Sequence, residues 1–113
     1  MILKKLVEEL IRKDRVHPDN IVVLSPYRYD NKRLGIKKLI DGNPGIFSLD
    51  VTQKGQDKIR VSTIQSFKGL EADVVILCGI DGHQPACKPS ILYVGATRAR
   101  SMLYVIQKQN PDI

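Results

Sequence analysis

The sequence predicts an α/β fold in which helices flank a mainly parallel β-sheet. Two nearly continuous apolar runs, Ile21–Leu24 and Asp73–Leu77, are typical of strands that are covered on both faces. Helical and strand patterns also alternate along the chain, which is the order expected of parallel strands joined by crossover connections.

The first part of the chain is predicted to contain two helices. Apolar residues recur at helical spacing from residue 2 to residue 11, and charged residues fill the opposite face. A turn is expected at His17–Asn20, just before the first strand. Asp30 and Asn31 are residue types that cap helices, so a second helix is expected from there to about Ile40. Gly42 follows where a left-handed residue would end that helix.

The second part of the chain is predicted to contain more strands and a third helix. Phe47, Leu49 and Val51 alternate with polar residues, and residues 59–64 repeat this pattern. Loops are expected at residues 52–58 and 79–89, and a modest helix at residues 90–98. A last strand is expected at residues 101–107, with Met102, Tyr104 and Ile106 on one side and Leu103 and Val105 on the other.

Length and composition limit the possible classes of protein. The 113 residues fit one domain, residues 1–113, and 42% hydrophobic residues are enough for one core. No apolar run approaches the roughly 18 residues of a membrane span, and the N-terminus lacks a signal peptide, so we expect a cytoplasmic protein without membrane contact. The two cysteines are too few for a disulfide framework or a zinc site. The net charge of +6 favours an anionic partner.

Two blocks contain residues suited to phosphate chemistry. After the strand ending near Ile64, the side chains of Gln65, Ser66 and Lys68 suit a phosphate oxygen, and the segment is expected at the carboxyl ends of the strands. A polar loop with a solvated lysine is an equally good interpretation. The second block ends a predicted helix with Arg98, and it is expected at the same edge. A guanidinium there could stabilise a transferring phosphoryl group, or it could be a surface charge favoured at a helix C-terminus.

The two blocks resemble known motifs. TIQSFKGLEADVVIL (Thr63–Leu77) and LYVGATRAR (Leu92–Arg100) are similar to motifs V and VI of UvrD/Rep-type superfamily 1 DNA helicases. IVVLSPYR (Ile21–Arg28) more weakly resembles the start of the second motor lobe in that family. The resemblance implies a RecA-like lobe of the P-loop NTPase type. The phosphate loop itself, Gly-x-x-x-x-Gly-Lys-Ser/Thr, does not occur in the sequence.

The resemblance also implies site residues. Arg98 would be an arginine finger that reaches the γ-phosphate of ATP, and Glu71 would lie near the nucleotide sugar. Lys68 and Gly69 would shape the loop that links the two sites. The residues implied on the nucleotide side are Arg98, Glu71, Gly69 and Arg28, and those on the DNA side are Thr63, Gln65, Ser66 and Lys68.

The chain departs from the family pattern at three points. Gln65 stands where motif V usually has histidine, and Phe67 stands where a small residue is common. Only about 30 residues separate Arg28 from the motif V strand. This spacing leaves no room for the helical 2B insertion of the UvrD/Rep enzymes, so we expect the compact UvrD-C/RecD-like branch.

The resemblance therefore implies the C-terminal motor lobe of an ATP-dependent DNA helicase or translocase. ATP with Mg²⁺ would be held mainly by an absent first lobe, in the same polypeptide or in a separate subunit, and single-stranded DNA would be the nucleic-acid partner. The chain is expected to be a fragment of a larger protein and to be inactive alone. A free-standing, non-catalytic nucleic-acid-binding module is the main alternative, and a plain α/β domain that binds neither ligand is another.

Overall fold

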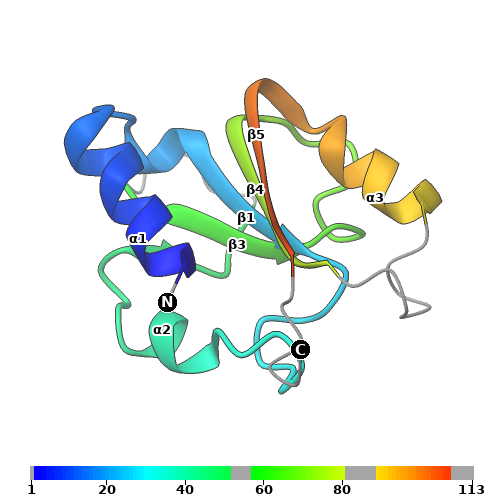
Figure 1. Ribbon diagram of the computed structural model, residues 1–113, viewed down its shortest axis with the longest axis horizontal. Helices are drawn as coiled ribbons and strands as arrows, with labels where there is room; N and C mark the ends of the chain where they lie inside the picture. Colours follow the sequence, from blue (N-terminus) through cyan, green and yellow to red (C-terminus); the bar gives the residue numbers. More distant parts are fainter. Residues whose placement is uncertain (1, 52–56, 81–88, 108–113) are drawn as a thin grey trace.

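The computed structural model describes residues 2–51, 57–80 and 89–107, and these form a five-stranded sheet in the order β2-β3-β1-β4-β5 (Figure 1). Every neighbouring pair of strands is parallel, so the α/β prediction is confirmed. The elements are α1 (Ile2–Glu8), a π-helical turn (Glu9–Lys13), a 3₁₀ turn (Pro18–Asn20), β1 (Ile21–Ser25), α2 (Lys37–Asp41), β2 (Phe47–Ser48), β3 (Ile59–Thr63), β4 (Ala72–Ile80), α3 (Pro89–Ala96) and β5 (Ala99–Gln107).

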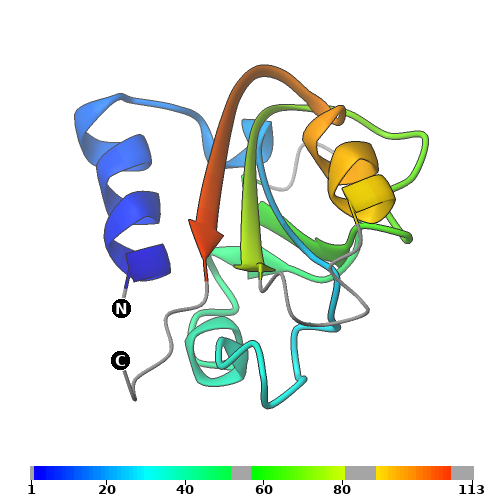
Figure 2. The ribbon, with the colours of Figure 1, turned by 45° about the vertical axis from the view of Figure 1, so that its right-hand side comes forward.

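The sheet separates two apolar cores. Successive side chains of a strand point to opposite faces, so Ile21 and Val23 of β1 pack with α1 and α2, whereas Val22 and Leu24 pack on the α3 side. Figures 1 and 2 show α1 and α3 on opposite sides of the sheet. All five residues of β1 are buried, as the apolar run predicted for a central strand.

The second helix is shorter than predicted. The expectation of a helix from Asp30–Asn31 to Ile40 is wrong, because α2 begins only at Lys37. Asn31 caps a local turn instead, and its side-chain oxygen accepts a hydrogen bond of 2.9 Å from the backbone N–H of Arg33. Gly35 then adopts a φ of 71°, which ends any right-handed helix at that point. Gly42 follows the end of α2, but its φ is −77°, so the expectation of a left-handed residue there is also wrong.

The strands agree with the predictions at their centres and differ at their ends. The alternating pattern from Phe47 to Val51 forms only the two-residue β2, and Leu49 is half exposed. Gly79 and Ile80, expected in a loop, belong to β4, and Pro89 begins α3. The remainder of that loop, residues 81–88, and most of the loop at 52–58 lie outside the described residues.

The last strand is an edge strand. The predicted alternation in β5 is seen, because Tyr104 and Ile106 pack against the α1-side core and Leu103 and Val105 line a hollow beside α3. Leu103 and Val105 remain 42% and 50% exposed, and among the described strands β5 pairs with β4 alone. Among the described residues, no helix is long and apolar enough to cross a membrane.

Candidate functional site

The crossover segment, residues 64–71, connects β3 to β4 and determines where the predicted site residues lie. Ser25 is in register with Thr63, so the segment starts at the carboxyl edge of the sheet. Ile21 is in register with Val74, so the segment ends at the amino edge. It must run the length of the sheet because both strands are parallel to β1, which lies between them.

The start of the crossover segment presents polar groups at the carboxyl edge. The Thr63 hydroxyl oxygen accepts a hydrogen bond of 3.1 Å from the backbone N–H of Ser66, and the Lys68 N–H donates to the Gln65 carbonyl at 3.2 Å. These bonds form a tight turn in which the side chains of Gln65, Ser66 and Lys68 are exposed. The Thr63 hydroxyl still carries its own proton, so it can donate to an anion. The turn thus offers hydroxyls, an amide and an ammonium group.

A hollow of about 260 Å³ lies beside this turn. Thr63 and Ser66 line it together with Arg28 and Tyr29 from the segment that follows β1. The Arg28 side chain is 78% exposed, and its Nε lies 3.5 Å from a carboxylate oxygen of Asp30. The structure therefore brings Arg28 to the residues predicted on the DNA side and away from Glu71 and Arg98, with which the sequence grouped it.

Glu71 and Arg98 come together at the opposite, amino edge. The backbone N–H of Ala72 donates to the Arg98 carbonyl at 3.0 Å, and Ala72 is in register with Ala99. The expectation that both motifs lie at the carboxyl edge is therefore wrong for these two residues. The physical reason is the connection: α3 returns the chain to the edge where β5 must start, so the end of α3 lies at the amino edge.

The Arg98 guanidinium is packed on the end of α3. Its Nε donates to the Val94 carbonyl at 3.2 Å, and one terminal nitrogen donates to the Thr97 hydroxyl oxygen at 3.1 Å. A carbonyl at a helix C-terminus lacks an intrahelical partner, so Arg98 also stabilises α3. Arg100 differs, because its guanidinium pairs with the Asp73 carboxylate of the adjacent strand at 2.9 Å.

Two glycines determine how the motifs fit together. Gly69 in the crossover segment has a φ of 86°, and no atom would lie within 4 Å of an added Cβ, so glycine is needed there for the backbone rather than for space. In α3, a Cβ on Gly95 would lie 3.0 Å from both Ile64 and Leu77. Gly95 therefore lets α3 approach the start of the crossover segment closely.

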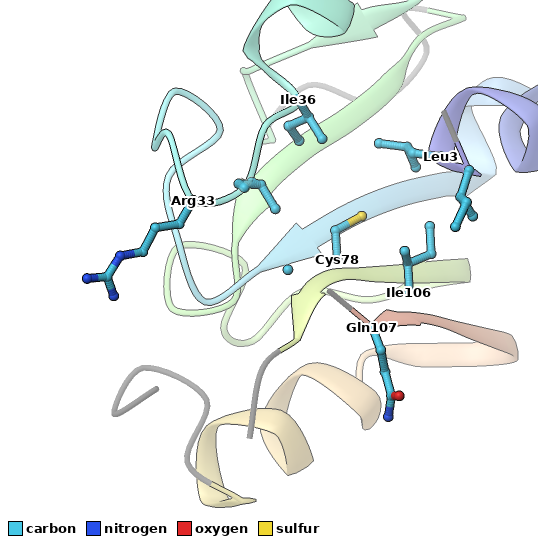
Figure 3. A pocket seen from close by; sticks show the side chains of 9 residues that line it. Leu3, Arg33, Ile36, Cys78, Ile106 and Gln107 are labelled. Carbon is cyan, nitrogen blue, oxygen red and sulfur yellow. The ribbon is translucent and has the colours of Figure 1, made fainter. Parts of the chain in front are cut away.

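An apolar pocket of about 190 Å³ lies on the other face, between α1, residues 33–36 and the ends of β4 and β5. Figure 3 shows Leu3, Ile36 and Cys78 around it, with the Arg33 side chain directed away. Burial raises the pKa of the Cys78 thiol to about 12, so the thiol stays protonated and behaves as a small apolar group. This pocket contains none of the predicted site residues.

One buried residue was not anticipated from the sequence. Arg60 lies in β3, where the alternating pattern assigns every second side chain to a polar face, yet only 3% of its surface is exposed. The sequence feature that could have indicated this burial is Phe67. A large ring at a position that usually holds a small residue must pack against another side chain.

Metal binding is limited in the part of the chain that the structure describes. No group of three or more His, Cys, Asp or Glu side chains there could hold a metal ion.

Solved structures show what the fold is similar to. A C-terminal domain of a possible DNA helicase from Lactobacillus plantarum WCFS1 superposes with a TM-score of 0.65 at 18% identity, over 93% of this chain and 65% of that one. The C-terminal part of the Fun30 ATPase domain superposes with a TM-score of 0.59 at 17% identity, over 96% of this chain and 40% of that one. The chain thus spans less than two thirds of both. At these identities the likeness shows a shared RecA-like α/β fold.

Sequence comparison supports the resemblance carried by the two motifs. Curated proteins include no significant match to the chain. Residues 58–106, which run from β3 to β5, match the family model of the UvrD-like helicase C-terminal domain. This region contains both motifs and the crossover segment. The resemblance carried by the motifs is therefore confirmed over residues 58–106.

Proposed function

We propose that this chain is the C-terminal motor lobe of an ATP-dependent DNA helicase or translocase that works in the cytoplasm. The crossover segment is the observation that carries the proposal. Its first residues form the polar turn at one edge of the sheet, and its last residue, Glu71, lies beside Arg98 at the other. A single eight-residue connection, residues 64–71, thus links two chemically distinct edges.

The carboxyl edge would hold single-stranded DNA by its backbone. The hydroxyls of Thr63 and Ser66, the Gln65 amide and the Lys68 ammonium group are suited to phosphate and sugar oxygens. Arg28 adds a positive charge to the same hollow. Such contacts carry no sequence information, so binding should be independent of sequence and sensitive to salt.

The amino edge would contribute to a nucleotide held mainly by the first lobe. ATP with Mg²⁺ supplies the phosphoryl group whose transfer releases the energy for movement. Closing the two lobes would bring the Arg98 guanidinium to the developing negative charge, and Glu71 would lie on the sugar side. Arg98 must exchange its contacts with Val94 and Thr97 for that role, so hydrolysis would depend on closure.

Replacing Lys68 with alanine tests the DNA edge. We expect the dissociation constant for a fluorescent oligothymidine strand to rise by roughly two- to fivefold, and the salt slope of log K to fall by about 0.7, because one phosphate contact is lost. Fluorescence anisotropy over a salt series measures both quantities. Lys4→Ala is the matched control, since Lys4 is an exposed lysine on α1, on the other face. Equal effects of the two variants would argue against a DNA site at this edge.

The isolated chain should not hydrolyse ATP, because its sequence contains no phosphate loop. Phosphate release from the purified chain, with and without oligothymidine, is expected to stay at the level of the buffer. Robust turnover that Arg98→Ala abolishes would contradict the proposal that this lobe supplies only half of the nucleotide site.

A non-catalytic nucleic-acid-binding module is the second candidate. The hydrogen bonds from Arg98 to Val94 and Thr97 favour it, because they give this arginine a structural role that a lobe without motor activity would still need. Under this candidate, Arg98→Ala leaves the function intact and Lys68→Ala weakens DNA binding. The mass of the native polypeptide, by immunoblot, separates the two: a product near 12.7 kDa favours the module.

A further inference from the structure

Arg60 is a buried arginine with incomplete hydrogen bonding. One terminal nitrogen, Nη1, donates to the Val51 carbonyl at 3.2 Å, whereas Nε and Nη2 have no hydrogen-bond partner among the described residues. Only 3% of the residue is exposed. A buried guanidinium with two unmatched nitrogens is unfavourable, so its place in the core calls for an explanation.

The partner of Arg60 is the ring of Phe67. The central guanidinium carbon lies 5.1 Å from the ring centroid, and Phe67 is fully buried. A desolvated guanidinium over an aromatic face is attracted by the ring quadrupole more strongly than an exposed one. Burial lowers the Arg60 pKa and the charge of Asp19 opposes this shift, while an arginine remains protonated at neutral pH.

Phe67 occupies the middle of the crossover segment. Its backbone N–H donates to the Thr63 carbonyl at 3.2 Å, and its carbonyl accepts from the Leu70 N–H at 3.0 Å. The same residue therefore belongs to the polar turn at the carboxyl edge and to the turn that leads to Glu71. A shift of the Phe67 ring must move both turns, because the backbone connects them.

We propose that Arg60 and Phe67 form a positioning pair that holds the crossover segment against β3. Arg60 anchors the ring from the β3 side, and the ring sets the position of the polar turn relative to Glu71. The pair rests on the proposed function, because the turn that it positions is the DNA-facing one. Arg60 contacts neither ligand, so it acts only through Phe67. The competing explanation is that both residues merely fill the core.

Amide hydrogen exchange in the isolated chain tests the pair without any ligand. Arg60→Met keeps an apolar chain of similar length and removes both the charge and the unmatched donors, so global stability should be unchanged or higher. Phe67→Leu keeps apolar bulk and removes the ring. We expect the amides of Lys68 and Leu70 to exchange roughly tenfold faster in both variants. In Arg60→Met the amides of β1 should not exchange faster, because only local opening is affected. Unchanged exchange at Lys68 and Leu70 overturns the proposal.

Oligothymidine binding tests the functional consequence. Both single variants and the double variant should weaken binding by the same factor of roughly tenfold, since either change breaks one shared contact. The salt slope should stay at the wild-type value, because Arg60 makes no phosphate contact. Lys4→Met removes one remote charge and controls for net charge. Wild-type affinity in the variants overturns the positioning role and leaves the proposed function standing. Absence of binding by the unmodified chain is a different result and removes both.

Discussion

Arg98→Ala should lower DNA-stimulated ATP turnover by about a thousandfold in a protein that combines this lobe with a first lobe, because an arginine finger contributes at least that much to phosphoryl transfer. Binding of ATP should change far less, since the phosphate loop of the first lobe provides most of the contacts. Steady-state phosphate release at saturating oligothymidine measures the effect. Turnover within tenfold of the wild type would contradict the role of Arg98.

The structural role of Arg98 requires matched controls. Thr97→Ala removes the hydroxyl that accepts from one guanidinium nitrogen and keeps the guanidinium, so it should leave turnover nearly unchanged. Arg98→Lys keeps the charge but loses the fork geometry and should remain strongly impaired. Arg100→Ala breaks the ion pair with Asp73 and tests whether any arginine at this edge matters. A large loss of turnover in Thr97→Ala would show that the geometry of the α3 end, not the guanidinium, is limiting.

Gly79→Ala should destabilise the fold by about 2–3 kcal/mol, from a strained backbone and from overpacking. Gly79 has a φ of 69° inside β4, and an added Cβ would lie 2.7 Å from Leu34 and 3.2 Å from the Ser25 hydroxyl. Urea denaturation followed by circular dichroism gives the free energy of unfolding. The loss should come with an unchanged m-value, because the surface exposed on unfolding is the same.

Gly35→Ala separates the two causes of this loss. Gly35 has nearly the same φ, 71°, and no atom within 4 Å of an added Cβ, so it suffers the backbone strain alone. Its loss should be about 1 kcal/mol. Adding Leu34→Ala to Gly79→Ala should make the double variant more stable than additivity predicts, because the closest clash is removed. Equal losses at Gly79 and Gly35 would show that the crowding around Gly79 costs nothing.

The central strands could be predicted from the sequence because a run of apolar residues marks them and no competing local preference occurs there. The apolar run of β1 requires burial on both faces, and burial on both faces requires a parallel sheet with helices on each side. The second helix could not be predicted, because two local preferences compete there. Asn31 can cap a helix or close a turn, and the positive φ of Gly35 decides for the turn.

The sequence proposed residues for the candidate site, and the structure decided how those residues are arranged. The motifs identify Thr63, Gln65, Ser66, Lys68, Glu71 and Arg98 by residue type and spacing. Their division between two edges depends on the crossover from β3 past β1 to β4, which is a property of strand order. Arg28 moves to the DNA-side hollow for the same reason, since it follows the carboxyl end of β1.

By itself, the sequence determined the α/β class, the buried central strands and the family motifs, because these depend on periodicity and on residue types at short range. The tertiary structure alone decided which motif residues meet. It brought Glu71 to Arg98 and Arg28 to Thr63. Such contacts arise from strand order and crossover direction, and residues at long sequence separation leave no local pattern that records them.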